Sequence, residues 1–85
     1  SPAPVGGQLR ERGEMAAAIG GELAGAARVQ LDILSAEDRA EVEEMLEELE
    51  RSVAAVNALL REARPDEAAL SAAVEQLERS LEATR

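Results

Sequence analysis

The feature that most limits the possible folds is an apolar stripe in residues 36–63, a segment without glycine or proline. Apolar residues recur there every seven positions, at Val42, Leu49, Val56 and Ala63. Others fill the second half of each repeat: Met45, Leu46, Val53, Leu59 and Leu60. Such a repeat is typical of an amphipathic helix that packs along a seam against another helix. We therefore predict an all-α fold built around a long helix over residues 36–63.

The residues on either side of this segment predict a helical hairpin. Ser35 is a good N-cap, and Asp38 stands three residues later, where a capping box places Glu or Gln. Pro65 ends the long helix, because the residue before a proline avoids the α conformation. Asp66 is then the predicted N-cap of a helix over residues 67–83. The turn is short, so the two helices should be antiparallel neighbours.

A further helix is predicted over residues 8–34, with its apolar side at Leu9, Met15, Ile19, Leu23, Ala26, Ala27 and Leu34. Three glycines leave open whether its middle is a continuous helix. Gly20 and Gly21 could break the helix, or Gly21 and Gly25 could let another helix approach closely. Residues 1–7 contain two prolines and two glycines, and we expect them to form a flexible tail or linker to something upstream. Residues 8–85 are then a single helical bundle domain.

The core of this bundle should be thin. Of the 39 apolar residues, 18 are alanine, and the chain has no aromatic residue. The helix over residues 67–83 should reach back only to about Glu47, so the stripe from Val42 to Leu46 needs another cover. The first helix or a second copy of the chain could provide it, and we expect a homodimer or a higher oligomer. The predicted interface seam comprises Val42, Met45, Leu46, Leu49, Val53, Val56, Leu59, Leu60, Leu70, Val74, Leu77 and Leu81.

The charge of the chain limits its partners. Eighteen acidic residues and nine arginines give a net charge of −9, without lysine or histidine. This balance argues against nucleic acid and anionic membranes as partners. The cluster Glu41, Glu44, Glu47 and Glu48 could be a docking face for a basic partner or a site for a hard cation. It could also be a solvated face with intrahelical pairs such as Glu47–Arg51 and Glu75–Arg79.

The residues needed for catalysis are missing. Without histidine or cysteine, the serines have no ordinary base partner, and no phosphate-binding loop is present. We therefore predict a non-enzyme with no catalytic residues, cofactor or metal. No signal peptide is visible, which predicts a cytoplasmic protein. The richness in alanine, glutamate, arginine and leucine is typical of a high-GC bacterial genome.

The capped acidic segment from Leu34 to Glu50, followed by Arg64-Pro65-Asp66 and a leucine-rich helix, resembles helical hairpins of bacterial multidomain proteins. These are the effector-associated helical domains of conflict and signalling proteins, and the docking or dimerisation domains of polyketide synthases. Both resemblances imply a small bundle that joins proteins. We therefore predict a protein–protein interaction module, used for oligomerisation, docking or as an adaptor. The alternative is an acidic, antitoxin-like inhibitor of a basic partner.

Overall fold

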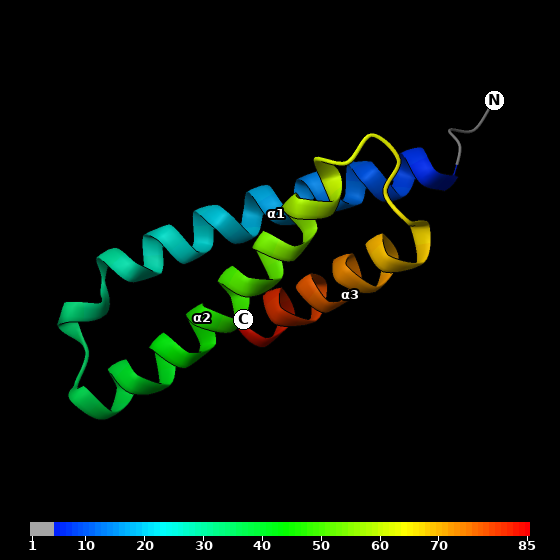
Figure 1. The fold of residues 1–85 in the computed structure, drawn as a ribbon. Coiled ribbons are helices and arrows are strands. Elements are labelled where there is room, and N and C mark those ends of the chain that lie inside the picture. The colour runs from blue at the N-terminus through cyan, green and yellow to red at the C-terminus, as the bar shows by residue number, and fades with distance from the viewer. Residues whose placement is uncertain (1–4) are drawn as a thin grey trace.

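The computed structural model describes residues 5–85, which form three α-helices and one 3₁₀ turn (Figure 1). Helix α1 spans Val5–Val29, η1 spans Leu31–Ile33, α2 spans Ala36–Leu60 and α3 spans Glu67–Ala83. No strand occurs among these residues. The predicted all-α class is confirmed, as is the antiparallel hairpin of α2 and α3. The molecule is elongated, with extents of 51 × 21 × 18 Å.

Side-chain caps fix the starts of α2 and α3. The Asp38 amide donates to Ser35 Oγ over 3.2 Å, and the Ala69 amide donates to Asp66 Oδ2 over 2.9 Å. Both caps were predicted, because each side chain satisfies an amide that has no partner within the helix. Helix α2 ends at Leu60, three residues before its predicted end. There the Arg10 guanidinium donates to the Leu60 carbonyl over 3.1 Å, which places a cation at the negative end of that helix.

Helix α1 differs from the prediction at both ends and in its middle. It begins at Val5, so residues 5–7 are helical, and residues 1–4 of the predicted tail lie outside the described range. The two prolines precede this start, and a glycine costs a helix only about 1 kcal/mol. The helix continues through Gly20 and Gly21 without a break and ends at Val29. Residues 31–33, predicted as α-helix, form η1 instead.

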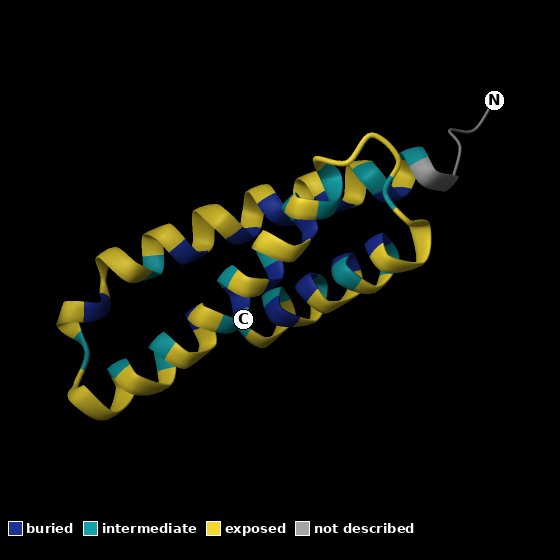
Figure 2. Cartoon of the chain, in the orientation of Figure 1, coloured by how far each residue is buried: buried dark blue, intermediate teal, exposed yellow. Residues whose placement is uncertain are grey.

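The apolar side predicted for residues 8–34 is confirmed at Leu9, Ala27 and Leu34, which belong to or pack against the core cluster, and is wrong at the other four residues. Met15 is 67% exposed and Ile19 51% exposed, and Leu23 and Ala26 are also exposed (Figure 2). The buried side consists of Leu9 and small residues at helical spacing, namely Gly13, Ala16, Ala17, Gly20 and Ala24. The cause is the close approach of the helices, because a Cβ on Gly20 would lie only 2.7 Å from Val53 Cγ2. The close approach that Gly21 and Gly25 could have allowed does not occur, since nothing lies within 4 Å of either Cβ position.

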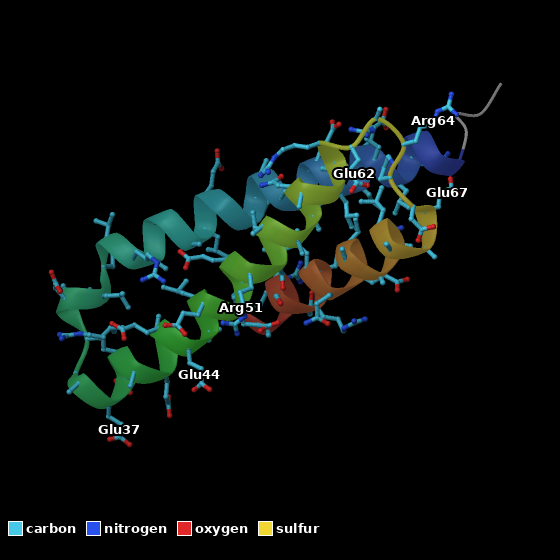
Figure 3. All side chains as sticks on the ribbon, in the orientation of Figure 1. Glu37, Glu44, Arg51, Glu62, Arg64 and Glu67 are labelled. Atoms are coloured by element: carbon cyan, nitrogen blue, oxygen red, sulfur yellow. The ribbon has the colours of Figure 1, made fainter. Side chains whose placement is uncertain are left out.

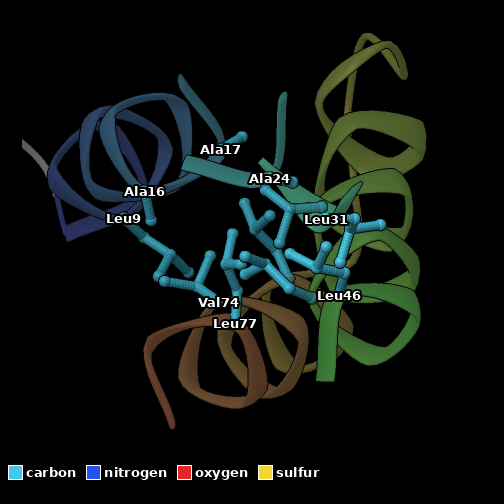
Figure 4. Close-up of a cluster of buried hydrophobic side chains, with 11 residues drawn as sticks. Leu9, Ala16, Ala17, Ala24, Leu31, Leu46, Val74 and Leu77 are labelled. Carbon is cyan, nitrogen blue, oxygen red and sulfur yellow. The ribbon is translucent and has the colours of Figure 1, made fainter. Parts of the chain in front are cut away.

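A single hydrophobic cluster holds the three helices together (Figure 4). Leu49 and Val56 of α2 and Val74 and Leu77 of α3 are fully buried at its centre. Ser52 and Ser80 are also buried, and their hydroxyl oxygens lie 3.3 Å apart between α2 and α3. Fully burying one such aliphatic side chain stabilises a fold by about 1.5–3 kcal/mol. Helix α1 contributes mainly backbone and methyl groups to this core.

Helix α3 is shorter than its two neighbours and leaves one end of the molecule uncovered. The contact between Ser52 and Ser80 sets the antiparallel register, so the last turn of α3 is level with about Leu49. Helix α2 extends beyond this level by about 20 Å, and α1 extends beside it (Figure 1). We call the part formed by residues 22–50 the open end. It consists of two helices where the rest of the bundle has three.

Candidate functional site

The open end exposes apolar side chains that α3 does not reach. Met45 and Leu23 are both 39% exposed, and Val29 and Ile33 at the tip are 82% and 80% exposed. Leu46 is buried, because the residues of α1 and η1 cover it from one side. Most large apolar residues of a stable domain lie inside, so an exposed group of them beside a hydrophobic core often marks an interaction surface. The open end is therefore the candidate functional site.

A hollow of about 590 Å³ lies where the end of α3 meets α2. Met45 provides its apolar lining on α2, and Ser80 and Ala83 belong to α3. The carboxylates of Glu41, Glu44 and Glu48 line the same hollow, together with Arg51, Gln76 and Arg79. The structure thus brings three of the four predicted acidic docking residues next to one exposed residue of the predicted seam. An apolar floor with charged sides is suited to an amphipathic ligand.

One carboxylate of the hollow already accepts hydrogen bonds from other side chains of the protein. Glu48 accepts hydrogen bonds from the Arg51 guanidinium over 2.9 Å and from the Gln76 amide over 3.2 Å. These two bonds hold the pKa of the Glu48 carboxyl below its ordinary value. The predicted intrahelical pairs are replaced, because Arg51 binds Glu48 and not Glu47, and Arg79 donates to Gln76. Glu41 and Glu44 have no salt-bridge partner within residues 5–85.

Glu47, the fourth predicted docking residue, lies outside the hollow. Its charge acts on Arg28 of α1, as does that of Glu43. Arg28 donates two hydrogen bonds to the Glu50 carboxylate, over 2.6 and 2.7 Å, and this contact lowers the pKa of Glu50. The acidic residues of α2 therefore divide between two flanks. One flank borders α3, and the other faces α1.

The open end holds nearly all of the net charge of the chain. Residues 22–50 carry ten carboxylates and two arginines, a net charge of −8. The remaining residues carry eight carboxylates and seven arginines, a net charge of −1. Both arginines of the open end are engaged, Arg28 with Glu50 and Arg39 with the carbonyls of Leu31 and Leu34. The surface there is strongly acidic, whereas the other end is balanced.

No group of three or more acidic residues in the described part of the chain is arranged to hold a metal ion. The helices over residues 5–85 include none with the length and apolar character to cross a membrane.

Most of the predicted seam lies in the core of the single chain. Leu46, Leu49, Val56, Leu70, Val74 and Leu77 are buried. Val42, Val53, Leu59, Leu60 and Leu81 are half-buried against them, and Met45 is the exposed member. Helix α1 supplies the cover that these residues need, with Leu31 of η1 buried in the same cluster. The exposed residues Met15, Ile19 and Leu23 were missed as surface residues, because their spacing is equally that of a core-facing stripe.

Comparison with protein-family models, curated proteins and solved structures found no match to this chain.

Proposed function

We propose that this chain is a non-catalytic protein–protein interaction module that binds its partner through the open end. The observation that carries the proposal is the coincidence of uncovered apolar side chains with the acidic charge. Met45 and Leu23 remain exposed beside a completed core, and Glu41 and Glu44 line the hollow with Met45 and have no salt-bridge partner among the residues that the structure describes. The cytoplasmic location expected from the sequence remains part of this proposal.

The buried seam affects which partner is favoured. A homodimer was expected because the stripe from Val42 to Leu46 needed a cover. In the single chain, Leu46 is only 3% exposed and belongs to the same buried cluster as Ala24 of α1 and Leu31 of η1. The apolar seam therefore supplies no strong reason for two copies to associate. A different protein that binds the open end in a docking or adaptor role is favoured instead.

Site-specific photo-crosslinking in the cells that make the protein tests this proposal. A photoactivatable residue in place of Met45 should give a discrete adduct of the chain with another protein or with itself. The matched control carries the same residue in place of Glu62, which is exposed at the opposite end of the fold (Figure 3). An absence of adducts at position 45, or equal adducts at positions 45 and 62, would contradict an interaction role for the open end.

The alternative function is an acidic inhibitor that blocks a basic protein. The net charge of −8 on residues 22–50 favours it, because such a surface steers and holds positively charged partners. An inhibitor of this kind should lose its target as salt is raised, since exposed charges are screened within about 8–10 Å at physiological ionic strength. Binding that weakens with salt but persists at high ionic strength would favour the docking role, because the apolar side chains of the open end then contribute as well.

A further inference from the structure

We propose that the partner of the open end is a basic amphipathic helix that lies where α3 would continue if it were longer. This inference rests on the proposed function and specifies the chemistry of its partner. The incoming helix would turn the two-helix part of the molecule into a three-helix bundle. It would place apolar side chains between α1 and α2 and positive side chains over the acidic rims.

The apolar floor of this position comes from both helices. Met45 borders the end of α3, because it lines the same hollow as Ser80 and Ala83. Leu23 stands eleven residues, about three turns, after Arg12, so the two lie on the same side of α1. Arg12 binds Glu78 of α3 with two hydrogen bonds of 3.0 and 2.8 Å, which shows that this side of α1 faces α3. Leu23 of α1 and Met45 of α2 thus lie on the side of these two helices that α3 covers in the rest of the bundle.

The length of the uncovered face fits a helix. The face continues for about 20 Å along α2, the length of about 13 helical residues. Val42 and Leu34 of the open end are half-buried and pack against the core cluster. A helix of that length seated there would reach from the end of α3 to the tip.

The rims of the face require positive charge. Glu41 and Glu44 border Met45 on α2, and exposed Glu22 lies next to Leu23 on α1. The C-terminal end of α3 points into the same space, and a helix C-terminus carries about half a negative charge. A partner helix with arginine or lysine beside its apolar stripe would neutralise both rims. A neutral or acidic helix would leave these charges facing one another without compensation.

A second copy of the chain offers no basic helix among the residues that the structure describes. Among the three helices of the structure, α1 has no net charge, α2 carries −6 and α3 carries −3. Two open ends would also bring two charges of −8 together, and like charges at an interface oppose association. The charge of this chain therefore favours a different, basic partner over self-association.

A fluorescent peptide of about 14 residues, helical in pattern, with leucine on one face and arginine on both flanks, is a direct probe. Its binding to the full chain is measured by fluorescence anisotropy, and the stoichiometry by titration. Two control peptides are needed. One has glutamate in place of arginine, and the other has the same composition in an order that removes the apolar stripe. The arginine peptide should bind one to one and at least about tenfold more tightly than either control.

Matched protein variants locate the binding. Met45→Glu should weaken binding by at least about tenfold, whereas Met15→Glu adds the same charge to an exposed methionine outside residues 22–50 and should not. Glu41→Gln with Glu44→Gln should weaken binding by about two- to fivefold for each charge removed. Glu62→Gln with Glu67→Gln changes the net charge equally at the other end of the fold and should have no effect (Figure 3). Circular dichroism shows whether each variant retains its helices.

Each remaining outcome overturns a different claim. Equal binding of the ordered and reordered arginine peptides, or equal effects of the paired variants, would mean nonspecific charge attraction. A chain that dimerises, and that Met45→Glu converts to a monomer, would show that the occupant is a second copy. In both cases the inference fails while a crosslink at position 45 still supports the proposed function. If that crosslink is absent, the proposed function fails as well.

Discussion

Two adjacent glycines of α1 provide a controlled test of helix packing. Gly20 faces the core, where a Cβ would lie 2.7 Å from Val53 Cγ2, 3.4 Å from Leu77 Cδ1 and 3.5 Å from Leu49 Cδ1. A Cβ on Gly21 would have no neighbour within 4 Å. Replacing either glycine with alanine makes the same chemical change in the same helix. The two variants differ only in what the new methyl group meets.

The expected magnitudes follow from these distances. Alanine in a helix interior is favoured over glycine by about 1 kcal/mol, so Gly21→Ala should stabilise the protein by about 0.5–1 kcal/mol. Gly20→Ala gains the same amount but forces the short, branched Val53 side chain or the helix itself to move. An overpacked core costs about 1–3 kcal/mol. Gly20→Ala should therefore be less stable than Gly21→Ala by about 1–3 kcal/mol.

Urea unfolding followed by far-ultraviolet circular dichroism measures both free energies, and thermal melts provide a second readout. A difference of 1 kcal/mol shifts the Tm of a domain of this size by about 4–8 °C. Equal stabilisation by Gly20→Ala and Gly21→Ala would refute the close approach of α1 to α2 and α3. The small-residue face of α1 would then have no role in packing.

Three further predictions concern the core and one ion pair. Leu49→Asp should abolish cooperative unfolding, because it buries a charge at a fully buried position; a sharp urea transition would contradict this. Ser52→Ala should lower the free energy of unfolding by about 1 kcal/mol, because it leaves the buried Ser80 hydroxyl without its partner. The double variant with Ser80→Ala should lose little more, because no hydroxyl then remains unpaired. If urea unfolding shows that the losses of the two single variants add in the double variant, the contact between the hydroxyls is contradicted. The Arg12 guanidinium lowers the pKa of Glu78, so this pair stabilises the fold above the ordinary carboxyl pKa and the effect disappears as pH falls through the lowered value. In Glu78→Gln, the free energy of unfolding should therefore fall less on acidification than in the unchanged protein, by at most about 1 kcal/mol because the pair is exposed. If urea unfolding at several pH values gives the same pH dependence for both proteins, the pair contributes nothing to stability.

The sequence predicts the hairpin well because its signals are local. The N-caps at Ser35 and Asp66 and the proline at position 65 depend only on neighbouring residues, and the limits of α3 agree with the prediction. The apolar stripe of α2 is wide and regular, so its buried side is also predicted. These features do not depend on what packs against the hairpin.

The face of α1 could not be predicted in the same way. Its large apolar residues, such as Met15 and Ile19, have the spacing of a core-facing stripe, yet they are exposed. The decisive residues are the two glycines on the buried side. Because they have no side chain, Gly13 leaves room for Val56 and Val74, and Gly20 leaves room for Val53. Spacing alone does not show which side of a helix will face a crowded neighbour. The hollow beside Met45 likewise depends on the length and register of α3, and these appear only when the helices are assembled.

The absolute mass of the chain in solution, measured by light scattering at low and high salt, tests the central claim most directly. If α1 closes the core within one chain and the open end is reserved for a basic partner, the mass should be 9.0 kDa at both salts. Twice that mass at both salts would mean that a second copy completes the bundle. A dimer at high salt alone would also contradict the account, because it would show apolar self-association that charge repulsion normally suppresses.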